Sequence, residues 1–465
     1  MNAPTIWIIA PVLIAILLLP IRNQRALSII GGLVTILLAI AAQFIPIEEA
    51  FRFGEFFVKI DSSLAVLGRI LEIKPAEGSL LAIIYGATAL WFFGAEASKT
   101  ATRIVPYGLL ITAFLVASIA VEPFLFAALF IELAVLFSVP LLTRIDQPPG
   151  RGIVRFLIYQ TLAMPFILFS GWLLAGVEAS PGDIALAAQS ASMLGLGFAF
   201  LLAVFPFYNW IPMLMEEAPP FIVGFLLWIL PTITIVFGAG FLDRYSWLRS
   251  SPQLATTLQY VGLLMIVTGG LWAASQRHLG RIMAYSSIAE TGFSILALSL
   301  DPRLGIPILF LLLPARALGL AVWSLSLTVI KDHSETLRFG AVRGLLRSVP
   351  FASAGLVLAA LSTSAFPLLA GFPARLALWE NLSRVSLGAA LWLGIGIIGL
   401  LTSSFRTMAV LSMAEEYTSW ELREDWLQGI MLGLGMIGLF VLGLFPQFVQ
   451  YFLSDLPAMF EHLGR

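Results

Sequence analysis

The sequence predicts an all-α integral membrane protein of about 14 transmembrane helices, with two inverted five-helix repeats in which helices seven and twelve are broken. Of its 465 residues, 59% are hydrophobic and 11% are charged, whereas soluble domains are about 45–50% apolar and about 25% charged. Apolar stretches of membrane-spanning length recur along the whole chain. Together with a mean hydropathy of +0.96, these observations exclude a soluble enzyme.

Each predicted membrane span is a stretch of roughly 20 apolar residues, the length that a helix needs to cross the bilayer. The first stretch has no basic residue before it, while Arg22 and Arg25 follow it, so we interpret it as a retained helix and not a signal peptide. The stretches lie near residues 4–20, 26–45, 79–97, 104–121, 122–143, 152–176, 189–206, 219–241, 254–275, 281–300, 304–330, 350–379, 386–410 and 426–449.

The spans form one membrane domain with four parts. We expect alternating residues in Arg52–Asp61 to form a surface hairpin, and Gln450–Arg465 to form a short interfacial amphipathic helix. Of the 26 basic residues, 15 lie in odd-numbered connections, 9 in even-numbered connections or the C-terminal tail, and two within spans. This bias predicts that both termini are extracytoplasmic. The parts are 4–97 with the N-terminal helices and hairpin, 104–241 as the first repeat, 254–410 as the second repeat, and 426–465 with the last helix and tail.

Two spans contain a proline among polar or small residues. These are Pro206, in the seventh span, and Pro367, in the twelfth. Proline removes a backbone hydrogen bond and breaks a helix, which the bilayer tolerates only where protein or water satisfies the freed groups. Because paired broken helices mark the ion path in transporters built from inverted repeats, we predict two related halves. A kink that serves packing alone is the alternative interpretation.

Composition excludes several kinds of chemistry. The chain has no cysteine and three histidines, each near charged residues or the chain end, so we expect no cofactor and no metal in this chain. The phosphate-binding motif G-x-x-x-x-G-K-[ST] is absent from the sequence. The net charge of −1 does not favour binding of nucleic acid, and the lipid bilayer is the expected surrounding.

Ionisable residues within the predicted spans are the main candidates for function, because buried charge in a membrane is costly and marks pathways. Proton transfer requires groups that accept and release a proton, which glutamate and water do and arginine does not. The alternative is two buried Glu–Arg pairs that hold helices together. Loop acids Glu216 and Glu217 are further candidates, or are simply solvated. The candidates within spans are Glu132, Glu290, Arg316 and Arg375, with Ser286 and Ser287 beside Glu290.

Three motifs resemble the antiporter-like membrane subunits of respiratory complex I, most closely the N subunit. Phe205–Pro219, FPFYNWIPMLMEEAP, resembles that family's V-P-F-H-x-W-x-P-D-x-Y-E-G-A-P, with Tyr208 at the histidine position and Met213 at the aspartate position. Ser275–Phe293 is similar to its S-Q-x-x-x-K-R-L-L-A-Y-S-S-I-x-H-x-G-Y segment, and Ala365–Leu376 to its broken twelfth helix. The resemblance covers spans four to thirteen and extends to Mrp-type cation/proton antiporter subunits.

The resemblance also shows where this chain departs from the family. The fifth-helix glutamate of the family falls on Glu132, while its seventh-helix and eighth-helix lysines fall on Leu201 and, to within one residue, Pro231. The twelfth-helix lysine becomes Arg375, and the eleventh-helix histidine of related members becomes Arg316. All four lysines of the chain lie in connections. Since burial lowers the pKa of lysine far more readily than that of arginine, we expect a degenerate proton relay.

The resemblance implies a membrane subunit of a complex I-like NADH:quinone oxidoreductase that contributes to proton translocation coupled to quinone reduction. NADH, flavin, iron–sulfur clusters and quinone are then expected on partner subunits, and this chain has no redox centre of its own. The implied proton path includes Glu132, Glu290, Tyr208 and the serines. Two alternatives remain open: a spacer subunit that does not pump, and a subunit of a cation/proton antiporter or membrane hydrogenase-like complex. The implied location is a bacterial-type inner membrane.

Overall fold

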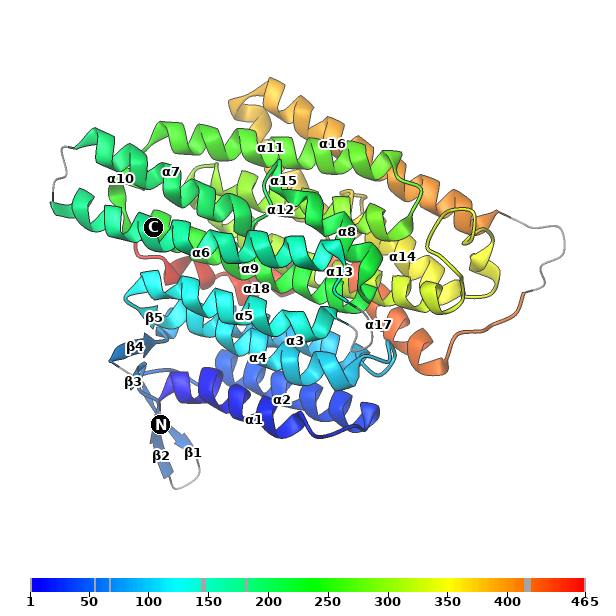
Figure 1. Cartoon of the computed structure of the whole chain (residues 1–465), viewed down its shortest axis with the longest axis horizontal. Coiled ribbons are helices and arrows are strands. Elements are labelled where there is room, and N and C mark those ends of the chain that lie inside the picture. The colour runs from blue at the N-terminus through cyan, green and yellow to red at the C-terminus, as the bar shows by residue number, and fades with distance from the viewer. Residues whose placement is uncertain are drawn as a thin grey trace.

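The structure is a computed structural model that describes residues 2–53, 56–66, 68–143, 148–179, 183–413 and 420–463. Nearly all of it is helical, and most of the long helices run in roughly the same direction, horizontally in Figure 1. The N-terminal helices are α1 (Ala10–Leu18, after a π-helical turn at Thr5–Ile9), α2 (Gln24–Phe44) and α3 (Gly78–Gly94). The multi-pass all-α fold is therefore confirmed.

Two successive sets of helices follow. The first set is α4 (Ala101–Ala120), α5 (Ala127–Leu142), α6 (Arg151–Ala179), α7 (Ile184–Leu201), α8 (Trp210–Glu217) and α9 (Pro220–Arg244). After α10 (Ser246–Arg249), the second set is α11 (Pro252–Ser275), α12 (Leu279–Leu298), α13 (Pro302–Asp332), α14 (Pro350–Thr363), α15 (Phe372–Val385) and α16 (Leu387–Ser412). Helices α17 (Trp426–Leu444) and α18 (Gln447–Leu453) complete the chain.

Each of the 14 predicted stretches contains a helix, but the exact number of membrane spans stays a prediction. Within the described ranges, eleven helices are long and apolar enough to cross a membrane. The apolar helices Thr5–Leu18 and Pro350–Thr363 are shorter. Helix α12 has 20 residues, but it carries Arg281, Glu290 and several hydroxyl side chains that lower its mean hydropathy.

Helices seven and twelve are broken where their prolines predicted. Helix α7 ends at Leu201 before α8 begins, and α14 ends at Thr363 before α15 begins. At each break a non-glycine residue has a positive φ, +51° at Ala203 and +58° at Ala365. The two sets also pack alike: α4 contacts α5 and α6 contacts α7, as α11 contacts α12 and α13 contacts α14. This correspondence agrees with two related halves.

Short strands lie outside the helices. The predicted hairpin is present as β1 (Ala50–Phe53) and β2 (Phe56–Lys59), antiparallel with Phe53 opposite Phe56. The prediction did not include a second sheet, in which β4 (Arg69–Glu72) lies between β3 (Ser63–Val66) and β5 (Val121–Glu122). β5 comes from the start of the predicted fifth span, so α5 begins later than expected.

The two terminal segments lie on the same side of the molecule. The Ala3 N–H donates to the Asp61 carbonyl at 2.8 Å, and the Lys74 ammonium pairs with Glu461 at 3.2 Å. Near the C-terminus the predicted interfacial helix is shorter than expected: α18 ends at Leu453, a 3₁₀ turn covers Leu456–Met459, and the final two residues lie outside the described part. Pro446 at the start of α18 and Pro457 further on limit this helix to seven residues.

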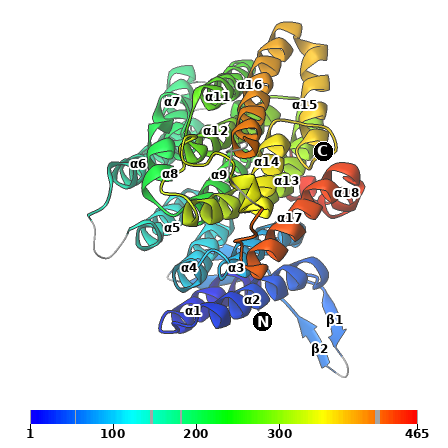
Figure 2. The same ribbon diagram turned by 90° about the vertical axis from the view of Figure 1, so that its right-hand side faces the viewer.

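The core lies between the two sets of helices. Figure 2 shows α1 and α2 at one end and α16 at the other, with α9 and α13 between them. In α9 and α13, 89% and 78% of the most apolar window is buried, whereas in α17 only 17% is buried. The outer helices expose large apolar side chains such as Trp392 and Phe440, as helices that face lipid do. The buried central helices therefore position the polar residues described next.

Candidate functional site

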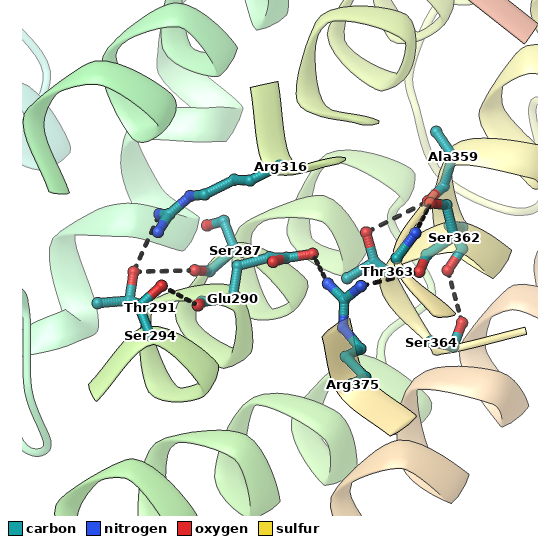
Figure 3. Close-up of polar contacts among 12 residues, drawn as sticks. Ser287, Glu290, Thr291, Ser294, Arg316, Ala359, Ser362, Thr363, Ser364 and Arg375 are labelled. Carbon is teal, nitrogen blue, oxygen red and sulfur yellow. Dashed lines mark hydrogen bonds and ion pairs between the residues drawn. The ribbon is translucent and has the colours of Figure 1, made fainter. Parts of the chain in front are cut away.

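The centre of the polar site is an ion pair between helices α12 and α15 (Figure 3). The Nη2 atom of Arg375 donates to Oε1 of Glu290, and the side chains are only 2% and 4% exposed. Of the two Glu–Arg pairs that the alternative interpretation required, this is the one present in the described part of the chain. Because both charges are out of water, each one needs the other.

The break of the twelfth helix supplies further partners for Arg375. Its Nη1 donates to the Ser362 carbonyl at 3.2 Å, and its guanidinium lies 4.7 Å from the centre of the Phe293 ring. Ser362 is in the last turn of α14, where carbonyl groups lack helical partners and the helix dipole favours a cation. The Ser362 hydroxyl in turn accepts the Gly371 N–H at 3.1 Å. The broken helix thus holds the arginine in place.

Arg316 binds α9 where a proline, Pro231, interrupts the hydrogen bonds of that helix. Pro231 in α9 cannot donate to the carbonyl of Leu227, four residues earlier, and Nη2 of Arg316 donates to that carbonyl at 2.9 Å. The same nitrogen donates to the Thr291 hydroxyl at 3.0 Å, and Thr291 donates to the Ser287 carbonyl at 3.2 Å. Arg316 therefore links α9 to the part of α12 that carries Glu290 and Thr291. Figure 3 shows Arg316 and Arg375 on either side of that part of α12.

Glu132 lies apart from this cluster. Its Oε1 accepts the Thr161 hydroxyl of α6 at 2.8 Å, while its buried Oε2 has no hydrogen-bond partner in the described part of the chain. No ion pair involving Glu132 is found among the described residues, so a buried Glu132–Arg pair is not present there. At the position of the family's partner lysine, the buried Leu201 offers only its carbonyl, which accepts from Gln160 at 3.1 Å.

The remaining candidates take separate places. Tyr208 is buried, with its ring 6.2 Å from that of Tyr285. Ser286 is buried on α12, and the hydroxyl of Ser287 donates back to the Ala284 carbonyl at 2.7 Å. Pro206 and Pro367 are exposed, so the break prolines do not themselves line the polar cluster.

Glu216 and Glu217 are the last two residues of α8 and not loop residues as expected, and both have partners in the protein while being partly exposed. Glu216 forms a two-bond pair with Arg281, at 2.6 and 3.1 Å. Glu217 accepts the N–H groups of Gly152 and Ile153, at 2.8 and 3.3 Å. Its carboxylate therefore caps the N-terminus of α6, where helix N–H groups are unpaired. Both acids therefore have partners in the protein, and Glu216 is also exposed to solvent.

Sequence reasoning missed two polar side chains near the cluster, Gln160 and Trp210. Gln160 is mid-helix in α6 and bonds the carbonyl at the end of α7, much as Arg375 does at the end of α14. It could have been found by extending the search for polar residues within spans from charged side chains to amides. Trp210 gave no such signal, because tryptophan is common throughout this chain.

His278 caps helix α12, which carries Glu290, and this cap should make the stability of the protein depend on pH. Its Nδ1 accepts the Arg281 N–H at 3.3 Å, which requires the neutral ring. Burial lowers the pKa of His278 below its ordinary value; Arg281 and Arg338 act in the same direction and Glu216 opposes them. Because the pKa of His278 is lower in the folded state, the stabilisation from this cap is fully present at pH values above the ordinary histidine pKa. It is lost as the pH falls through the folded-state pKa.

We therefore expect the thermal midpoint of the purified chain to fall between about pH 7 and about pH 5, and to fall less in His278→Asn. Asparagine keeps an acceptor at the helix N-cap but does not titrate in this range. The measurement is thermal unfolding of both proteins across that pH range. Identical pH profiles would contradict a role for His278 protonation, since the other two histidines are common to both proteins.

Comparison with known proteins identifies relatives of this arrangement. Residues 181–402 match the family described as "NADH:quinone oxidoreductase/Mrp antiporter, TM". NADH-quinone oxidoreductase subunit 14 of Thermus thermophilus is 29% identical over 67% of this chain and 71% of its own length. NADH-quinone oxidoreductase subunit N 2 of Acidobacterium capsulatum is 25% identical over 85% of this chain and 84% of its own length.

Solved structures show the same fold. A chain of respiratory complex I from Thermus thermophilus with bound NADH has a TM-score of 0.77 at 20% identity, covering 100% of this chain and 99% of that chain. A chain of the Mrp complex from Dietzia sp. has a TM-score of 0.80 at 16% identity, covering 98% and 97%. The broken helices and the polar core between them therefore lie in a fold shared by these assemblies.

Proposed function

We propose that this chain, which belongs to the NADH:quinone oxidoreductase/Mrp antiporter family through residues 181–402, is a membrane subunit of a complex I-like NADH:quinone oxidoreductase. In this role it contributes to proton translocation coupled to quinone reduction. The observation that carries the proposal is the buried Glu290–Arg375 pair at the broken twelfth helix. The NADH-quinone oxidoreductase subunits among its relatives support the choice of complex.

The expected surroundings follow from the same proposal. Other membrane subunits of the assembly are its partners, and they or further subunits hold NADH, flavin, iron–sulfur clusters and quinone. The membrane is the inner membrane of a bacterial-type cell, with both termini extracytoplasmic. The distribution of basic residues between connections supports this orientation. The proximity of the terminal segments supports only that both termini lie on the same side.

The proposed chemistry depends on glutamates and hydroxyl groups, because the arginines do not release protons. When Glu290 takes up a proton it becomes a neutral acid, and its ion pair with Arg375, which stays charged, is lost. Its carboxylate is on α12, and Nη1 of Arg375 also donates to the Ser362 carbonyl at the break, a bond that does not depend on the charge of Glu290. Movement at this break would therefore change the charge state that Glu290 can adopt.

A spacer subunit that does not pump is the second candidate. It is favoured by Leu201 and Pro231 at the family's lysine positions, and by the way both buried arginines bind backbone carbonyls. In that role the polar cluster would brace the helices, and Glu132 would have no task beyond its bond to Thr161.

Glu132→Gln distinguishes the two candidates. If the subunit translocates protons, we expect proton pumping by the assembled complex in sealed vesicles to fall about tenfold or more, because glutamine cannot take up the proton. Assembly should be normal, since Glu132 forms no ion pair among the described residues and glutamine can still accept from Thr161. The matched control is Glu421→Gln, which removes an exposed carboxylate paired with Arg423.

Both proton pumping and NADH:quinone electron transfer are measured on each variant. Unchanged pumping in Glu132→Gln, with normal assembly and electron transfer, would overturn the pumping role and support the spacer. Loss of electron transfer in the control as well would indicate a defect of assembly instead.

A further inference from the structure

A small cavity lies where the first broken helix meets the second set of helices. The space open to a molecule the size of water is about 10 Å³, which is about what one water requires. Its walls come from α6, the end of α7 and the break after it, α8, α9, α12 and α13. The lining includes Trp210, Leu227, Pro231, Ser287, Thr291 and Arg316.

Three polar atoms of this wall have no hydrogen-bond partner in the described part of the chain, and all three are donors. They are Nε and Nη1 of Arg316 and Nε1 of Trp210. The two side chains are 2% and 4% exposed. Such buried donors are costly when unpaired. The hydroxyl groups of the wall add no further unpaired donor, because Ser287 donates to the Ala284 carbonyl and Thr291 donates to the Ser287 carbonyl. The cavity therefore requires an acceptor.

The charges around the cavity are unbalanced in the same sense. Arg375 is paired with Glu290, whereas the hydrogen bonds of Arg316 go to neutral acceptors, the Leu227 carbonyl and the Thr291 hydroxyl. Among the described residues of the cluster there are thus two guanidinium groups and one carboxylate. Burying an unpaired charge within a membrane is expensive, so a bound negative charge would relieve both deficits.

We propose that this cavity is a binding site for a small monovalent anion of the halide class, such as chloride, held by Arg316 and Trp210. The anion accepts from the free guanidinium nitrogens and the indole N–H, and it neutralises Arg316. It also bridges Trp210 of the first broken helix to Arg316 of the second set, so it joins the two halves. This site is independent of whether the subunit pumps protons.

The test compares the thermal midpoint of the purified full chain in chloride, in bromide, and in gluconate at equal ionic strength. Gluconate has a six-carbon chain and cannot enter a cavity of this size, whereas a halide ion is a single atom only slightly larger than a water molecule. We expect chloride and bromide to raise the midpoint in a saturable way, because a ligand bound to the folded state stabilises it by mass action. Crystals grown in bromide should show one anomalous peak between Arg316 and Trp210.

Two variants locate the effect. Arg316→Met removes the charge and should abolish the chloride dependence. Trp210→Phe keeps the ring but removes the indole N–H, and should weaken the apparent chloride affinity about tenfold, the effect of one hydrogen bond to a charged group. The matched control is Trp247→Phe, which removes a buried indole N–H that is likewise unpaired but does not line the cavity; its chloride affinity should equal that of the parent.

Several outcomes would overturn the proposal. Equal midpoints in chloride and gluconate, with no anomalous peak in the cavity, would mean that water alone fills it. A chloride effect that persists in Arg316→Met and Trp210→Phe would place the anion elsewhere. If Arg316→Met does not fold, Trp210→Phe and the bromide crystals still decide, because neither requires removal of the buried charge.

Discussion

Arg375→Met is expected to lower the free energy of unfolding by about 3–5 kcal/mol. The substitution leaves the Glu290 carboxylate buried without its cation, and it leaves the Ser362 carbonyl without the guanidinium at the end of α14. Methionine fills much of the same space, so lost packing is a small part of the effect. The measurements are the thermal midpoint of the purified chain and the yield of the assembled complex.

Two further variants test the cause. In Glu290→Met/Arg375→Met both charges are removed, and the loss of stability should be smaller than in Arg375→Met alone, because no unpaired charge remains. The matched control is Arg423→Met, whose pair with Glu421 is about 60% exposed on both sides; we expect it to cost about 1 kcal/mol or less. A double variant that is less stable than the single one would show that packing dominates.

Gly371→Ala is expected to disrupt the same ion pair without removing either charge. A Cβ at this position would overlap both Nη1 of Arg375 and the carbonyl oxygen of Ser362. The side chain could move, but the Ser362 oxygen belongs to the backbone at the end of α14. One methyl group should therefore force apart the contacts that hold the broken helix, at a cost of about 1–3 kcal/mol, typical of overpacking.

The control for Gly371→Ala is Gly394→Ala in α16, where a Cβ would meet no heavy atom within 4 Å. There alanine should leave the thermal midpoint unchanged or raise it slightly, since it favours helix more than glycine does. Both variants are compared by thermal unfolding and, in the assembled complex, by proton pumping. If the two variants are equally stable, the close approach of Gly371 to Arg375 does not constrain the break.

The helix breaks and the apolar spans were predicted from local sequence signals. The structure contains the breaks, and each predicted span contains a helix. Pro206 and Pro367 remove backbone hydrogen bonds wherever the rest of the chain lies, so their effect could be predicted from the sequence. The hairpin near Phe53 was predicted in the same way, from alternation within a few residues. Its neighbour, the sheet of β3, β4 and β5, was not predicted, because β5 pairs across about fifty residues of chain.

The candidate site was only partly predictable. The energetic cost of burying a charge in a membrane singled out Glu290, Arg316 and Arg375 as residues of the core, and all three are buried. Their partners could not be deduced, because Glu290 and Arg375 are 85 residues apart and are brought together only by packing of α12 against α15. The same argument predicted that Glu132 is buried, but it is only half-buried, and its carboxylate accepts a hydrogen bond from Thr161 on the neighbouring helix α6.

By itself, the sequence determined that this chain lies in a membrane, where its helices are interrupted, and that Glu290, Arg316 and Arg375 are buried, because hydropathy and proline chemistry act locally. Only the tertiary structure decided which charges meet. It pairs Glu290 with Arg375, gives Arg316 the carbonyl that Pro231 leaves free, and places Trp210 and Arg316 in the wall of one cavity. In a medium of low dielectric constant, these distances between helices decide whether a buried charge is compensated.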